Sequence, residues 1–166
     1  ELLPPWLRFV RGVVESADLP LNVSRELVQD NPKVGRIRKR LVKKVLDAMG
    51  TMLSGERDEY EGFWLAFGSF IKEGIYFGDD EDSRISNLCL FQSSRSDGWT
   101  TLAEYVGRMG KEQDAIHVIC GPDRKTLESS PHLEALKARG EEVLLLTDPV
   151  DEWMLQRLTE FDGKAL

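Results

Sequence analysis

Two neighbouring stretches in the first half of the chain repeat apolar residues every three or four positions. This spacing is typical of amphipathic helices. The first helix is expected to begin at Asn31-Pro32, a capping residue followed by proline, and to end at Ser54-Gly55. The second is expected to begin near Glu56, and its aromatic face is most simply a core face packed on the first helix. The apolar faces comprise Val34, Ile37, Leu41, Val45, Met49 and Leu53, followed by Tyr60, Phe63, Trp64, Phe67, Ile71 and Ile75.

The start of the chain has a different pattern. From Leu7 to Val14, apolar residues recur at alternate positions on each side of an extended chain. Leu7, Phe9 and Val13 fall on one side of an extended chain, and Val10 and Val14 fall on the other. Segments rich in Val and Phe favour strands, so a strand is predicted over residues 7–14. A loop and a short helix are expected to follow it.

The second half of the chain alternates short apolar runs with helical segments, after an acidic break, GDDEDS, at residues 78–83. Two strands with a helix between them predict a right-handed βαβ unit and a parallel sheet. Residues 85–91 are consistent with either a helix or a strand. The predicted fold class is α/β. The predicted strands are residues 116–120 and 143–146, with a helix at residues 131–139 between them. Further helices are predicted at residues 101–109 and from Asp148-Pro149.

Charge is distributed unevenly along the chain. The net charge is −7, yet residues 33–44 carry seven cations and no acid, which leaves −14 for the rest. Most of these cations fall opposite the apolar face, whereas Arg38 falls within it and must reach solvent, pair with a carboxylate or face a polar interface. The absence of interleaved aromatic residues and the acidic flanks disfavour nucleic-acid binding. An alternative function remains: a binding module that uses helix 33–44 for an acidic partner or nucleic acid.

Familiar catalytic patterns are absent from the sequence. It contains no GxxxxGK[ST], no GxGxxG after a strand and no GxSxG. His117 is expected to be a packed strand residue and His132 a solvated one. The Gly121-Pro122 turn follows a predicted strand, where α/β enzymes often bind ligands, but a plain tight turn is favoured there.

The cysteines and the hydropathy pattern restrict the environment of the protein. Cys89 and Cys120 lack metal-ligand or redox-motif spacing, so both are predicted to be reduced thiols in a reducing compartment. No apolar run approaches the roughly 18 residues of a membrane-spanning helix. The chain begins at Glu1 and resembles a piece of a longer protein.

The stretch LNVSRELVQ, residues 21–29, places a cation at a predicted helix start. Ser24 is a good N-cap, and the free N–H groups behind it favour an anion over a guanidinium. Arg25 and Gln29 are four residues apart and share one side of the helix, with Asn22 just before it. They form either a phosphate receptor or an indifferent surface cluster, and these residues alone leave both interpretations open.

Longer motifs resemble the heat-shock protein 90 chaperone family, and they cover essentially the whole chain in the family's order. The segments DNPKVGRIRK and DPVDEW are most similar to the bacterial form of the family. The resemblance is to the middle domain. The motifs are LLPPWLRFVRGVVESADLPLNVSRELVQ, IRKRLVKK, FWLAFGSFIKEG, LAEYVGRM, SSPHLEALKARGEEVLLLTDPVDEW and LTEFDGKAL.

The resemblance implies a division of the chain and a role for it in a larger machine. Residues 1–31 would be the end of a large α/β middle subdomain, residues 32–78 a helical linker hairpin, and residues 79–166 a small α/β/α subdomain with a parallel sheet. In this family an N-terminal domain binds ATP with Mg²⁺ and a C-terminal domain forms a homodimer. The parent would be a cytoplasmic ATPase that binds unfolded clients.

The resemblance also implies site residues. Arg25 matches the arginine that contacts the γ-phosphate of ATP, and Asn22 and Gln29 match its polar neighbours. Glu152 and Trp153 match a region that contacts clients, although Trp153 also fits the edge of a core. By itself the chain is expected to be no enzyme and to bind no cofactor, nucleic acid or membrane.

Overall fold

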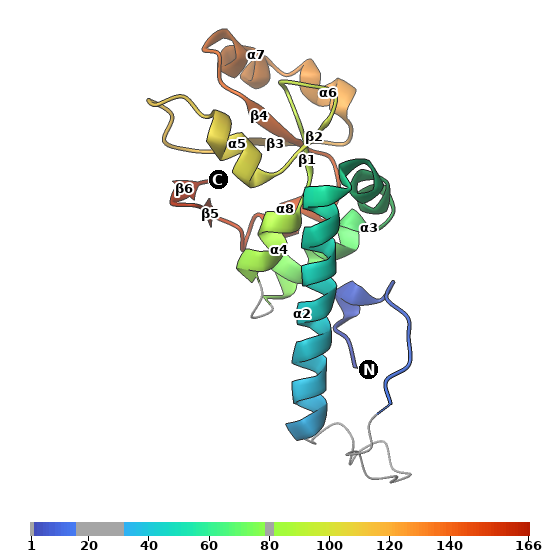
Figure 1. Cartoon of the computed structure of the whole chain (residues 1–166). Helices are drawn as coiled ribbons and strands as arrows, with labels where there is room; N and C mark the ends of the chain where they lie inside the picture. The colour runs from blue at the N-terminus through green and yellow to red at the C-terminus, as the bar shows by residue number, and fades with distance from the viewer. Residues whose placement is uncertain (1, 16–31, 79–81) are drawn as a thin grey trace.

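The computed structural model describes residues 2–15, 32–78 and 82–166 (Figure 1). Its first element is a 3-10 helix, η1, at Pro5–Leu7. Two consecutive prolines fix the backbone for such a turn, and the N–H of Leu7 donates to the Pro4 carbonyl at 2.9 Å. The predicted strand over residues 7–14 is therefore wrong. The segment 8–15 pairs with no strand among the described residues. Phe9 and Val10 pack against the core, but Val13 is 89% exposed, so the alternation does not continue along one buried face.

Two long helices follow, as the apolar spacing predicts. Helix α2 spans Pro32–Gly55 and α3 spans Arg57–Phe77. The aromatic face of α3 divides: Tyr60 and Trp64 are buried in the core shared with α2, whereas Phe67 stacks on Phe9 with ring centroids 4.8 Å apart. Helix α3 ends at Gly78, which has a left-handed backbone (φ 68°). The left-handed backbone favours glycine there, and a Cβ would in addition displace the flexible guanidinium of Arg157.

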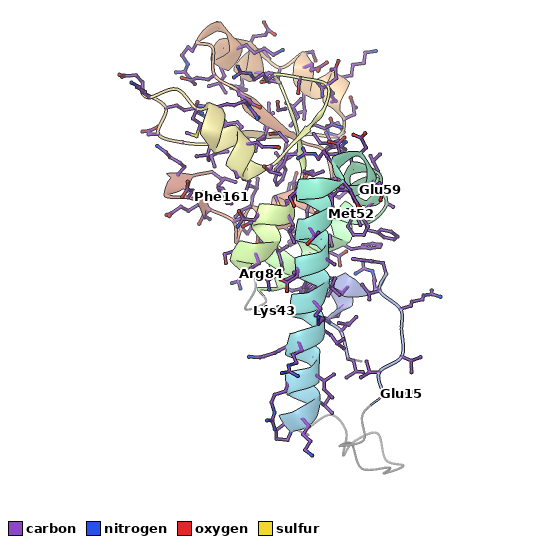
Figure 2. All side chains as sticks on the ribbon, in the orientation of Figure 1. Glu15, Lys43, Met52, Glu59, Arg84 and Phe161 are labelled. Atoms are coloured by element: carbon purple, nitrogen blue, oxygen red, sulfur yellow. The ribbon has the colours of Figure 1, made fainter. Side chains whose placement is uncertain are left out.

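The first half of α2 extends beyond the other helices (Figure 1). All seven cations of residues 33–44 are exposed, and Figure 2 shows Lys43 on this part of the helix. Arg38 is exposed as well, so it reaches solvent despite its place in the apolar pattern.

Farther along α2, Asp47 lies 2.5 Å from Arg84, a residue of the neighbouring helix α4.

The segment with an ambiguous pattern, residues 85–91, contains the end of a helix and the start of a strand. Helix α4 spans Asp82–Leu88, and strand β1 spans Phe91–Ser93. Strand β2, Trp99–Thr100, leads into α5, Leu102–Arg108, which confirms the helix predicted at 101–109. Its start is a capping box: the Thr101 hydroxyl accepts from the Glu104 N–H, and the Glu104 carboxylate accepts from the Thr101 N–H.

The sheet has four strands in the order β2-β1-β4-β3. Strands β3, His117–Cys120, and β4, Val143–Leu146, are parallel, as predicted. Strand β1 is antiparallel to both of its neighbours, so the sheet as a whole is mixed. Strands β2 and β3 are the outer strands of the sheet.

Hydrogen bonds from other segments cover the start of β3. The N–H of Ile116 donates to the Ala165 carbonyl at 2.7 Å, and the N–H of His117 donates to the Tyr105 hydroxyl at 3.0 Å. Ala165 belongs to the short strand β6, Lys164–Ala165, which pairs with β5, Glu160–Phe161. The final hairpin therefore lies against the beginning of this outer strand.

Helices cover both faces of the sheet, which agrees with the predicted α/β/α arrangement. Val143 and Leu145 pack under α6, Arg124–Glu128, and α7, Pro131–Ala138. Leu144 and Leu146 belong to the main core with α2 to α5. Because all four residues of β4 are buried, its sequence is continuously apolar instead of alternating. The last helix, α8 at Asp151–Met154, starts near the predicted Asp148-Pro149 signal but is only four residues long.

Cys89 and Cys120 are free thiols, the first buried and the second partly so, and burial raises the pKa of Cys89 to about 12. Within the described ranges, no helix has both the length and the apolar character needed to cross a membrane. The division of the chain at residues 31 and 78 stays a prediction.

Candidate functional site

The three residues expected to face a nucleotide, Asn22, Arg25 and Gln29, lie outside the described residues. Their role therefore stays a prediction from the sequence. Helix α2 resumes the described chain at Pro32, only a few residues later.

The other predicted pair, Glu152 and Trp153, lies on the single turn of α8, and both side chains are exposed. Trp153 is 52% exposed although its neighbour Met154 is completely buried. A tryptophan that marked the edge of a core would bury most of its ring. The exposure of Trp153 therefore favours the client contact that the resemblance implies over a place at the edge of a core.

Two aromatic residues at the end of α3 enlarge the surface around Trp153. The Trp153 ring lies edge-on to Tyr76, with centroids 5.6 Å apart and an interplanar angle of 66°. Tyr76 in turn contacts Phe77 at 5.3 Å, and Phe77 is 62% exposed. We call Tyr76, Phe77 and Trp153 the aromatic surface. Exposed aromatic rings supply large contact area at a low conformational cost, which suits the binding of apolar segments.

A buried ion cluster lies behind this surface. Lys72 of α3 is 3% exposed, and its Nζ lies 2.6 Å from Asp148 Oδ2 and 2.7 Å from Asp151 Oδ1. Burial lowers the pKa of Lys72, but the two carboxylates raise it by more, so the pKa lies above its ordinary value. Lys72 is therefore a permanent cation at neutral pH.

Sequence reasoning missed Tyr76, Phe77 and Lys72. Lys72 had a signal: it lies four residues after Gly68 and eight after Trp64, within the buried face of α3. A cation at such a position needs a carboxylate partner. Tyr76 and Phe77 had no such signal, because their exposure depends on where α8 packs.

One cavity of the described structure has a lining that is poorly suited to a nucleotide. This cavity, of about 630 Å³, is lined in part by Arg157 and by the acids Glu160 and Asp162. One cation beside two acids suits a triphosphate poorly. The turn at Gly121 is also filled, because Leu127 Cδ2 lies only 2.5 Å from where a Cβ would stand. This contact agrees with the plain turn expected there.

The His117 side chain lies against a carboxylate of the fold. Its Nε2 lies 2.9 Å from the Glu141 carboxylate, on the strand where the sequence predicts it. Arg139 also lies 3.2 Å from the same carboxylate oxygen. The imidazole therefore contributes to the packing of β3 against the loop before β4.

Comparison with known proteins finds similarity over the whole chain. The family model described as Hsp90 protein matches residues 1–166. Proteins named Chaperone protein HtpG are 53% identical to the chain over 166 residues in Myxococcus xanthus and 51% over 164 residues in Paramagnetospirillum magneticum. These matches include 100% and 99% of the chain, but 25% and 26% of the relatives. The chain thus spans about a quarter of the length of these relatives.

Proposed function

The chain belongs to the heat-shock protein 90 family, and from this premise we propose that it is a middle-domain segment of an ATP-dependent chaperone of the HtpG type. Its two contributions are a γ-phosphate contact from Arg25 and part of the surface that holds unfolded clients. The nucleotide, with Mg²⁺, would be held by the parent's own N-terminal domain. A C-terminal domain would form the homodimer, and the free thiols agree with a cytoplasmic location.

The aromatic surface is the observation that carries the client-binding proposal. Trp153 and Phe77 expose 52% and 62% of their surfaces, and the exposed acid Glu152 directly precedes Trp153 in the chain. Unfolded proteins present apolar side chains that folded proteins bury. A surface of rings with an adjacent carboxylate would favour apolar segments that also carry a basic residue.

Replacing Trp153 with alanine in the full-length chaperone should weaken binding of an unfolded protein by about 5- to 30-fold, as expected when a central aromatic contact worth about 1–2 kcal/mol is removed. The probe is fluorescently labelled, reduced and carboxymethylated α-lactalbumin, measured by anisotropy. Glu152→Gln should have a smaller effect that diminishes with added salt.

Leu65→Ala is the matched control for this experiment. Leu65 is another exposed apolar residue, 72% exposed on α3, and is not part of the aromatic surface. Its replacement should leave the affinity unchanged. Equal losses in Trp153→Ala and Leu65→Ala would mean that the chaperone binds clients without a defined site here.

The exposed cations of α2 support a second candidate function, binding of an acidic partner. All seven are exposed on the part of the helix that extends from the rest of the fold (Figure 1). If this face binds polyanions, the chain should retain a labelled oligonucleotide at 50 mM salt and release most of it by 200 mM, since contacts with several phosphates give a steep salt dependence. No retention at 50 mM salt would reject this function for nucleic acid.

A further inference from the structure

The turn that carries Trp153 is fixed from behind by a buried cation. Lys72 Nζ contacts Asp148 and Asp151 at 2.6 and 2.7 Å, and Asp151 is completely buried. The second carboxylate oxygen of Asp151, Oδ2, accepts a hydrogen bond from the Asp148 N–H at 2.9 Å. These contacts join α3 to both ends of the segment 148–151.

Helix α8 is too short to fix the direction of its side chains without contacts to other elements. It has four residues, fewer than a helix needs for stability in water. Its N-cap, Val150, provides no side-chain hydrogen bond. The direction in which Trp153 points must therefore come from contacts with the rest of the fold, which include the buried Met154, the Tyr76 ring and the Lys72 ion pair.

Stability alone does not explain a cation at position 72. The ammonium lies over the faces of the Phe91 and Trp64 rings, 5.3 and 5.9 Å from their centroids. An apolar side chain would fill this space without losing hydration, and buried ion pairs often contribute less than the apolar residues that could replace them. The ion pair instead fixes the orientation of α8. Because Lys72 contacts two carboxylates at short distances, the turn that carries them can take only one position against α3.

We propose that Lys72 is a positioning residue for the client-contact surface, which holds α8 so that Trp153 stays exposed against the edge of Tyr76. The inference rests on the proposed function, since it gives Lys72 its role through Trp153. Lys72 itself is buried and touches no client.

The test uses the full-length chaperone labelled with 5-fluorotryptophan. The double variant Lys72→Met/Asp151→Asn removes both buried charges and keeps an amide oxygen to cap Asp148. In ¹⁹F NMR spectra, the Trp153 resonance, assigned by its loss in Trp153→Phe, should shift or broaden. The resonances of Trp6 and Trp99 should change less, whereas that of Trp64, whose ring centroid lies 5.9 Å from the ammonium, is expected to respond to the substitution directly. Affinity for carboxymethylated α-lactalbumin should fall as far as in Trp153→Ala, and Lys72→Arg should restore part of both signals.

A second ion pair on α3 provides the matched control. Glu73, the residue next to Lys72, forms a bidentate ion pair with Arg8 at 2.6 and 2.7 Å. This pair does not involve α8. Arg8→Met/Glu73→Gln should leave the Trp153 resonance and the affinity unchanged. If the Lys72 double variant fails to fold, Asp148→Asn removes the carboxylate that is 44% exposed and should move the Trp153 resonance in the same direction.

An unchanged Trp153 resonance in a folded Lys72 double variant, or in Asp148→Asn, would overturn the positioning role. The proposed function fails separately. If Trp153→Ala binds α-lactalbumin as tightly as the wild type, client contact at this surface is rejected, while the fluorine spectra still decide whether Lys72 positions the ring.

Discussion

Replacing Arg25 with alanine in the full-length chaperone is expected to lower ATP turnover by on the order of 10- to 10³-fold. An arginine that contacts a transferring phosphoryl group can contribute 10³-fold or more, and a slow conformational step masks part of that contribution. Arg25→Lys should recover only part of the rate, because an ammonium keeps the charge and loses the planar, two-pronged donor geometry. Gln29→Ala should be milder, since a neutral amide does not balance developing charge.

The controls for Arg25 separate a contact with phosphate from a general effect of charge. Arg36→Ala removes another cation, one that is exposed on α2, and should leave turnover unchanged. Arg25→Ala should also leave the melting temperature of the 166-residue chain unchanged or slightly higher, because a cation is unfavourable at the helix start that the sequence predicts at Ser24. Wild-type turnover in Arg25→Ala, or a melt several degrees lower, would make the arginine structural.

The largest effect on stability is expected for Trp6→Ala, about 3–5 kcal/mol in the free energy of unfolding. Trp6 is 1% exposed, and its ring fills the space beside the helix α3 at Gly74. Truncation leaves a cavity that neither η1 nor α3 can close without moving. Urea unfolding of the 166-residue chain measures the loss, with Leu65→Ala as an exposed control expected within about 0.5 kcal/mol.

A double-mutant cycle makes the Trp6 prediction specific. A Cβ at Gly74 would lie 2.9 Å from Trp6 Cδ2 and 3.0 Å from Ile85 Cδ1. Gly74→Ala alone should therefore cost about 1–3 kcal/mol through overpacking. In the Trp6→Ala background the same change should become neutral or stabilising, because the ring is gone and alanine favours helices. Additive losses would show that the two residues do not share this contact.

The parts of the fold that the sequence predicts well are those with long periodic patterns. Helices α2 and α3 repeat their apolar spacing over 24 and 21 residues, so their existence is confirmed and their ends lie close to the expected ones. Strands β1 and β2 have three and two residues, too few for any period to appear. Helix α6 was missed for the same reason, although the Asp123 carboxylate that caps it was a usable signal.

The wrong prediction at residues 7–14 has a different cause. Alternation identifies a strand only when one face packs on a core and another strand supplies hydrogen bonds. In the described structure Leu7 is buried while Val13 is almost fully exposed, so the alternation does not continue along one face. Pro4 and Pro5 start a 3-10 turn instead, which a pattern of hydrophobicity does not detect.

The candidate site was predictable only in part. The pair Glu152-Trp153 was named from the resemblance, and its exposure needed the structure, because a residue beside an apolar stripe can turn either way. Its partners Tyr76 and Phe77 come from a helix more than seventy residues earlier in the chain. Contacts between such distant segments depend on the packing of α3 against α8, which no local pattern encodes.

The covered start of β3 has a consequence for how an unfolded chain can be held. Extended peptides often bind by adding a strand to the open edge of a sheet, which recruits many backbone hydrogen bonds regardless of sequence. Here one edge strand, β2, has only two residues, and at the other the N–H groups of Ile116 and His117 already donate to Ala165 and Tyr105. Short and occupied edges of this kind discourage strand addition and protect a sheet from aggregation. If the segment holds unfolded chains as proposed, it would therefore bind them through side-chain contacts and not by adding them as strands to its own sheet.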